Sequence, residues 1–70
     1  MTVEITCPEL LTELIEVLSR SGCPAIRTAA ARCCVRHPTA TSDHEARLEV
    51  AFFLRAWQLA HPGVVATLTP

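Results

Sequence analysis

The sequence contains no lysine and no tyrosine, and aromatic residues make up only 4% of the chain. All six basic residues are arginines, and the formal net charge is −1. A chain without a cationic excess has no electrostatic reason to require nucleic acid or an anionic membrane as a partner. Half of the residues are hydrophobic, which excludes intrinsic disorder. Arginine without lysine, with abundant alanine, is typical of a GC-rich bacterial or phage genome.

Long apolar runs are also missing. The run Val50–Leu54 is five residues long, whereas a membrane-spanning helix needs roughly 18. Residues Met1–Glu4 do not have a basic segment followed by an apolar one, so we expect no secretory signal and no membrane association. The expected location is the cytoplasm, where cysteines stay reduced. The chain has four of them: Cys7, Cys23, Cys33 and Cys34.

Motifs for catalysis are absent as well. There is no glycine-rich phosphate loop and no nucleophile motif. The acidic residues of the first twenty positions are most simply a solvated helix face. We therefore expect that the protein is not an enzyme, and we assign no catalytic residues.

What the chain does contain is a large amount of apolar surface for its size. Seventy residues make a single domain, residues 1–70, and such a chain buries only about 60% of its unfolded surface. The apolar surface that the fold cannot bury must face another molecule. Because closed homodimers are the commonest oligomers, a second copy of the chain is the first partner to expect. A different protein is the second.

Capping and proline signals predict an all-α fold of three helices, at about 7–20, 24–36 and 43–60. Residues 1–5 are expected to form an extended arm, and residues 64–70 an uncharged tail. Two copies of this three-helix domain would pair as a helical homodimer.

Short local motifs set these boundaries. Thr6 and Glu9 have the spacing of a capping box at the first helix, and Ser42 and Glu45 have it at the third. Gly22 supplies the left-handed residue that ends the first helix.

The segment 43–60 carries apolar residues on two separate faces. One is an ordinary core-facing stripe, made of Ala46, Val50, Phe53, Leu54, Trp57 and Ala60. Leu48, Phe52 and Leu59 cluster within about 40° on a different side of the helical wheel. A helix that is apolar on two faces packs against two surfaces. A three-helix monomer supplies only one of them, its own core. These three residues are therefore the candidate interface, with Phe52 as its anchor.

Cysteine and histidine offer a metal site as one alternative. Cys33 and His37 are four residues apart on the predicted second helix and could share one ion, completed by Cys23, His44 or His61. The chain has no Cys-x-x-Cys or His-x-x-His pair, however, and free cysteines usually behave as small buried hydrophobes. We assign no metal-binding residues.

Two Cys-Pro pairs suggest haem binding or redox sensing. Cys7-Pro8 and Cys23-Pro24 stand at predicted helix starts, where a thiol pKa is lowered. Cys-Pro also resembles the short motif by which some regulators bind haem. Two residues carry little specificity, so we assign no cofactor.

DNA binding is another alternative. The first two predicted helices and the turn between them loosely resemble a helix-turn-helix, with Arg27 and Arg32 on the second helix. The overall charge and the lack of lysine on that helix argue against it.

The function that the sequence favours is therefore a small cytoplasmic protein–protein interaction module. It would act as a homo-oligomer in the role of an adaptor, modulator or accessory subunit. A helix-turn-helix DNA-binding regulator and a Cys/His metal or haem sensor are the alternatives.

Overall fold

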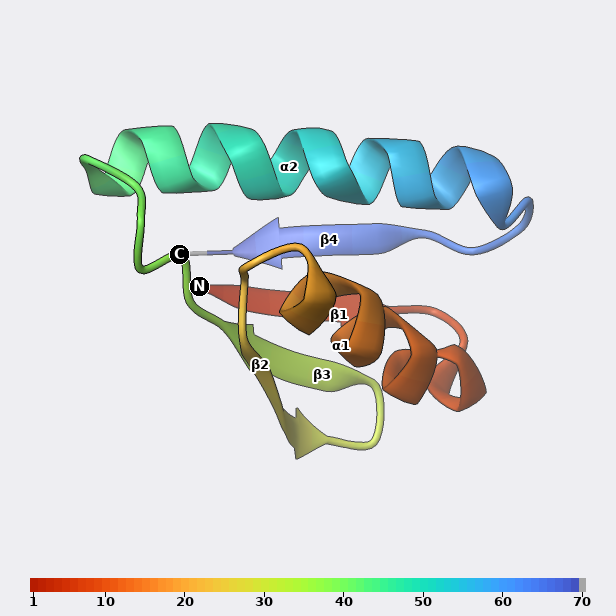
Figure 1. Cartoon of the computed structure of the whole chain (residues 1–70). Coiled ribbons are helices and arrows are strands. Elements are labelled where there is room, and N and C mark those ends of the chain that lie inside the picture. Colours follow the sequence, from red (N-terminus) through yellow and green to blue (C-terminus); the bar gives the residue numbers. More distant parts are fainter. Residues whose placement is uncertain (70) are drawn as a thin grey trace.

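The computed structural model describes residues 1–69, in which two helices and a short 3-10 turn alternate with four strands (Figure 1). Helices account for 45% of the residues and strands for 25%. In chain order the elements are β1 (Thr2–Ile5), η1 (Pro8–Leu10), α1 (Leu11–Arg20), β2 (Ala25–Ala29), β3 (Arg32–Val35), α2 (Asp43–Ala60) and β4 (Ala66–Thr69).

The four strands form one antiparallel sheet in the order β2-β3-β1-β4. The two termini of the chain therefore pair in the sheet, and Val3 of β1 lies between Cys33 on one side and Leu68 on the other. This β-α-β-β-α-β succession is the split βαβ, or ferredoxin-like, topology. Topology alone does not specify function.

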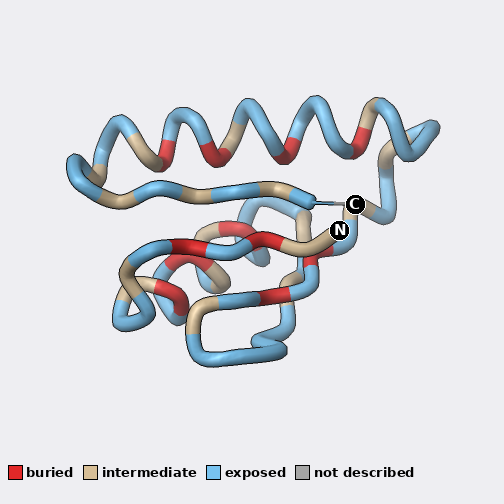
Figure 2. Tube along the Cα trace, turned by 180° about the vertical axis from the view of Figure 1, so that it is seen from behind, coloured by how far each residue is buried: buried red, intermediate tan, exposed pale blue. Residues whose placement is uncertain are grey.

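Both helices cover the same face of the sheet, and the core lies between them and the strands. Alternate residues of β1 and β3 point into it, as the period of two requires. Helix α1 contacts β2 and β3, and α2 contacts β4. In Figure 2 the buried positions of α2 lie on the side of the helix that faces the strands. The most buried core residues are Val3, Ile5, Leu11, Leu14, Leu18, Cys33, Val35, Val50, Leu54 and Trp57.

The predicted all-α fold is wrong, because residues 24–36 form the β2–β3 hairpin and not a helix. As a helix this segment would bury only a narrow face of small side chains. As a hairpin it places Cys33 and Val35 in the core, and β3 gains a paired strand on each side. The chain is an α+β domain and not a helical bundle.

The ends of the chain also differ from the expected arm and tail. Residues 2–5 are strand β1, and residues 66–69 of the predicted tail are strand β4. Pro70 lies outside the described residues. The two strands pair over four positions, so β1 and β4 are integral parts of the sheet.

Helix α2 spans residues 43–60 as predicted, whereas the helix predicted at 7–20 is an α-helix only from Leu11, after the 3-10 turn η1. Ser42 caps α2, because its hydroxyl accepts a hydrogen bond from the Glu45 N–H at 3.1 Å. Thr6 does not cap the first helix: its hydroxyl accepts the Val65 N–H at 3.0 Å instead. Neither α1 nor α2 is long and apolar enough to cross a membrane.

Gly22 ends α1 as expected. Its φ is +90°, a value that side-chain-bearing residues rarely adopt. The Cys23 N–H donates to the Leu18 carbonyl at 2.9 Å, and the Gly22 N–H donates to the Ser19 carbonyl at 3.2 Å. These two bonds form a Schellman motif, which satisfies the last carbonyls of the helix and turns the chain into β2.

Candidate interaction surface

The side of α2 that points away from the sheet is apolar and exposed. Leu48, Phe52 and Leu59 have exposed fractions of 59%, 77% and 78%. Figure 1 shows α2 as an outermost element, running along the top of the molecule above β4. The structure thus brings the three predicted interface residues together on one open surface. Their role as an interface stays a prediction.

Helical periodicity explains why α2 has two apolar sides. Four of its residues are buried against the sheet: Ala46, Val50, Leu54 and Trp57. On a wheel of 100° per residue, these four centre about 180° away from Leu48, Phe52 and Leu59. One side of α2 therefore closes the core, and the opposite side is displayed.

Three further exposed residues belong to the displayed side, although the sequence analysis did not assign them to it. Arg55 lies in line with the three apolar residues, and Ala51 and Ala56 flank them. The spacing of four, three and four residues between positions 48, 52, 55 and 59 could have revealed Arg55, because it is the heptad spacing of a packing helix. We define the outer face of α2 as Leu48, Ala51, Phe52, Arg55, Ala56 and Leu59.

A shallow groove extends the outer face toward the edge of the sheet. It is lined by His44, Arg47, Leu48, Ala51 and Leu68. This groove therefore joins Leu48 and Ala51 of α2 to Leu68 of β4, with His44 and Arg47 as its polar residues.

The free edge of β4 is itself a weaker candidate for docking. An uncharged edge strand can template pairing with another chain. Here, however, the Ala66 N–H donates to the Gln58 side-chain oxygen at 2.9 Å, and the Val64 N–H donates to the His61 carbonyl at 3.2 Å. One edge donor of β4 and one donor just before the strand are therefore engaged within the subunit. The helix face is the better candidate because it displays large exposed apolar side chains.

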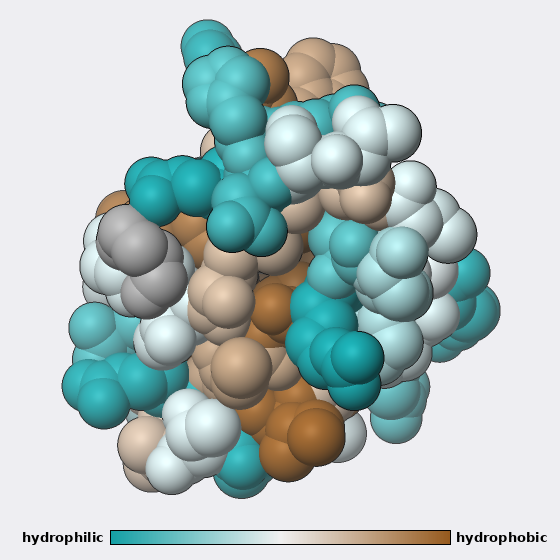
Figure 3. All heavy atoms as spheres, turned by 90° about the vertical axis from the view of Figure 1, so that its left-hand side faces the viewer, coloured by the Kyte–Doolittle hydropathy of each residue, from teal (hydrophilic) through white to brown (hydrophobic). Residues whose placement is uncertain are grey.

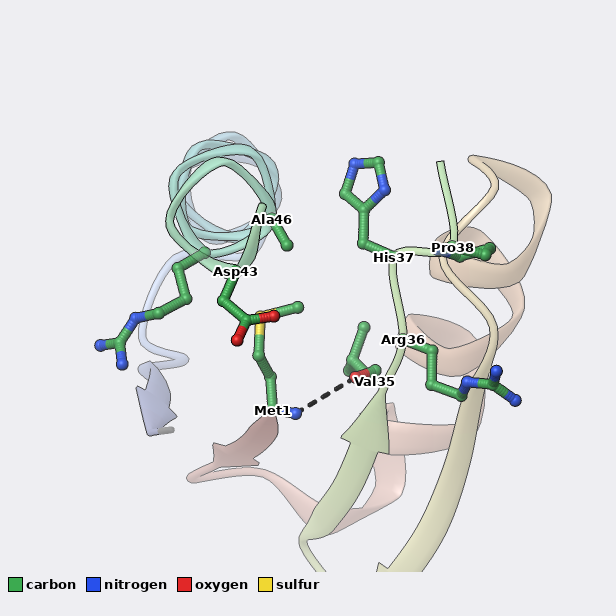
Figure 4. A pocket seen from close by; sticks show the side chains of 8 residues that line it. Met1, Val35, Arg36, His37, Pro38, Asp43 and Ala46 are labelled. Carbon is green, nitrogen blue, oxygen red and sulfur yellow. Dashed lines mark hydrogen bonds between the residues drawn. The ribbon is translucent and has the colours of Figure 1, made fainter. Parts of the chain in front are cut away.

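A cavity of about 540 Å³ lies where β3 ends and α2 begins. Figure 3 shows hydrophobic groups in a hollow on this end of the molecule, flanked by hydrophilic ones. In Figure 4 the Arg36 guanidinium points away from the cavity, and the Met1 amino group donates to the Val35 carbonyl at 3.3 Å. The lining residues are Met1, Val35, Arg36, His37, Pro38, Asp43, Ala46 and Arg47.

The histidine beside this cavity has a structural task. His37 Nε2 contacts the Glu49 carboxylate, and His37 Nδ1 lies 3.4 Å from the Thr39 hydroxyl. These contacts tie the connector that follows β3 to the middle of α2. The size of the cavity suits a small ligand, but the His37 imidazole is already engaged and the Arg36 guanidinium is turned outward.

The residues of the predicted Cys/His metal site are not gathered into one cluster in the part of the chain that the structure describes. Within residues 1–69, no group of three or more His, Cys, Asp and Glu residues could hold a metal ion. Cys33 and His37 lose their helical spacing because Cys33 lies in a strand. Cys33 is buried in the core, and Cys34, the next residue, points to the exposed opposite face.

The thiols at the Cys-Pro pairs are not activated either. Loss of hydration raises the pKa of the Cys7 thiol, and the neighbouring Glu9 raises it further. Burial, followed by the charge of Glu49, raises the pKa of the Cys23 thiol. A raised pKa lowers the thiolate fraction, the opposite of what a reactive cysteine needs.

The arginines predicted for a recognition helix lie on strands, so the helix-turn-helix interpretation is wrong. Arg27 donates to the Ala30 carbonyl at 2.7 Å and to the Thr12 hydroxyl at 3.0 Å. Arg32 pairs with Glu4 at 3.2 Å across two strands. Both side chains are engaged within the subunit, and no helix presents them to a groove of DNA.

Of the surfaces described, the outer face of α2 combines exposure, apolar character and regular spacing. The cavity, the cysteines and the arginines lack a comparable convergence of groups. Comparison with protein-family models, with curated proteins and with solved structures gives no match.

Proposed function

We propose that this chain is a small cytoplasmic protein–protein interaction module that works as a homodimer through the outer face of α2. In this proposal the protein has no catalytic activity of its own and acts as an adaptor, modulator or accessory subunit. The observation that carries it is the exposure of Leu48, Phe52 and Leu59 on a single helix face. Large apolar side chains that align over three helical turns mark interaction sites more often than single exposed residues do.

The free energies involved are compatible with a dimer. Burying one such side chain fully contributes about 1.5–3 kcal/mol. Three from each subunit give a gross gain of about 9–18 kcal/mol, against an association cost of about 4–15 kcal/mol. The surplus supports a stable dimer only if most of this surface is buried, which requires the two outer faces to pack along much of their length.

The cytoplasmic location is supported by the cysteines. All four are free thiols. Cys33 and Cys34 are neighbours in β3 whose side chains point to opposite faces of the sheet, so they cannot bridge each other.

Replacing Phe52 with glutamate tests the proposal. Phe52 is the largest side chain of the outer face and is 77% exposed, so it is the natural anchor of an interface there. At about 100 μM, well above the micromolar Kd that corresponds to about −8 kcal/mol, we expect the wild type to be dimeric. Phe52→Glu should be monomeric in analytical ultracentrifugation.

Ile26→Glu is the matched control, because Ile26 is 70% exposed but lies on β2, away from α2. This variant should remain dimeric. A monomeric wild type at about 100 μM would contradict the homodimer, and the outer face would then have to serve a different protein. A dimer that Ile26→Glu disrupts and Phe52→Glu does not would contradict the choice of surface.

A further inference from the structure

The residues of the outer face of α2 are spaced so that the face is complementary to a second copy of itself in antiparallel orientation. Positions 48, 52, 55 and 59 follow one side of the helix at the spacing of a coiled-coil seam. Three of them are Leu48, Phe52 and Leu59, and the fourth is Arg55. An arginine in the middle of an apolar seam needs a partner of suitable chemistry if that seam is buried.

We infer that two copies pack the outer face of α2 against the outer face of α2 in antiparallel orientation. The two-fold axis crosses the helix pair at the level between positions 53 and 54. This inference rests on the proposed homodimer. In an isologous interface, residue i meets residue j and residue j meets residue i. The axis places Leu48 opposite Leu59 of the second copy, and Phe52 opposite Arg55 of the second copy. All four seam positions are then matched at once.

The Phe52–Arg55 pairing gives the arginine its partner. A guanidinium over the face of an aromatic ring is attracted by the ring quadrupole, and arginine is more weakly hydrated than lysine. The arrangement occurs twice in the dimer, once on each side of the axis. Arg55 has no ion-pair partner within residues 1–69, so its guanidinium is available for this contact.

A parallel arrangement is disfavoured by the same residues. It would set each position against its own copy, so the two Arg55 guanidinium groups would meet in one layer of the seam. Like charges placed directly opposite each other in an interface oppose association. Arg55 therefore acts as the residue that specifies orientation, as single polar seam positions do in coiled coils.

The flanks of the face fit the antiparallel packing. The same axis places Ala51 opposite Ala56 of the second copy, and two small side chains allow the helices to approach closely. Gln58 and Glu49, at the borders of the face, are engaged within their own subunit. Gln58 bonds to the Ala66 N–H and to the Leu54 carbonyl, and Glu49 contacts His37.

The resulting dimer would have the two helix layers inside and the open sheet faces outside. The apolar side of α2 points away from the sheet in each copy. The exposed sheet face that carries Glu4, Arg32 and Cys34 would remain accessible on both copies.

A charge-swap pair of double variants tests the orientation. In the antiparallel dimer, Leu48→Glu/Leu59→Lys brings each introduced carboxylate against an introduced ammonium group. Leu48→Lys/Leu59→Lys brings ammonium against ammonium. The wild-type net charge is −1; the first variant keeps −1 and the second has +1, so the overall charge is matched in magnitude.

We expect the dissociation constant of the Glu/Lys variant, measured by sedimentation equilibrium, to be at least about tenfold lower than that of the Lys/Lys variant. Circular dichroism should show equal folding of both, because both positions are largely exposed in the subunit. In a parallel dimer both variants would suffer like-charge contacts, so equal dissociation constants overturn the antiparallel orientation. A monomeric wild type instead overturns the proposed homodimer, so the two failures are distinguishable.

Discussion

His61 links the end of α2 to α1. Its ring stacks on Trp57, with centroids 4.2 Å apart. The Nδ1–H donates to the Trp57 carbonyl at 2.9 Å, and Nε2 lies 3.2 Å from the Glu13 carboxylate of α1. The protonated imidazole can donate to both oxygens at once, whereas a neutral tautomer can donate to only one of them. The bond to the Trp57 carbonyl, with a smaller contribution from Glu13, raises the pKa of His61 above its ordinary 6.5.

This pKa shift predicts that stability falls as the pH rises. A group whose pKa is higher in the folded state contributes its full stabilisation below the unfolded value of about 6.5 and loses it as the pH passes the folded value. We expect the free energy of unfolding in urea to decrease between about pH 6 and pH 8. His61→Gln should flatten this decrease. His44→Gln, at an exposed position without these two bonds, should not; equal effects of both variants would contradict the assignment to His61.

At the scale of elements, α2 depends on a side-chain cap at its first turn. Ser42 has an extended backbone, with φ −156°, and its hydroxyl accepts from the Glu45 N–H. The Thr41 hydroxyl donates to the Glu45 carboxylate. Asp43 and Glu45 also place negative charge at the positive end of the helix dipole. The helix that carries the outer face is therefore fixed in position from its N-terminus.

Removing this cap should destabilise the domain measurably. Ser42→Ala is expected to lower the free energy of unfolding by about 1 kcal/mol, within the range of about 0.5–2 kcal/mol for such caps. Urea unfolding followed by the fluorescence of Trp57 measures the change. Ser19→Ala is the control, because Ser19 is exposed in α1 and alanine favours a helix. If both variants are equally stable, the hydroxyl of Ser42 does not contribute.

At the scale of the whole molecule, a core drawn from 70 residues leaves little stability in reserve. Domains of this size rarely reach more than about 3–5 kcal/mol without an additional constraint. Association of two folded copies adds stability by mass action, because the dimer forms from the folded state only. The proposed homodimer therefore has a consequence for folding as well as for function.

The melting temperature should accordingly depend on protein concentration. We expect the Tm of the wild type to rise by several degrees between about 5 and about 500 μM, since each added kcal/mol raises the Tm of a small domain by about 4–8 °C. Phe52→Glu should melt at one temperature over this range, and Ile26→Glu should behave like the wild type. A concentration-independent wild-type Tm would argue that folding is not linked to dimerisation.

The sequence by itself determined α2, the end of α1 and most of the residues that α2 buries or exposes, although Ala60, assigned to the core-facing stripe, is exposed. The Ser42–Glu45 spacing located the start of α2, Gly22 located the end of α1, and the 3.6-residue period separated the buried and displayed sides of α2. These features are local, because capping and periodicity involve residues within a few positions of one another. The candidate interface was predictable for the same reason.

Only the tertiary structure decided that residues 24–36 form a hairpin and that residues 2–5 and 66–69 form strands. Alanines in this segment favour a helix, whereas Ile26, Cys33 and Val35 fit a pleated sheet once neighbouring strands exist. Those neighbours come from distant parts of the sequence: β1 pairs with β3 and with β4. Strand pairing yields its free energy only when the partners meet, so a local pattern of thirteen residues could not reveal it.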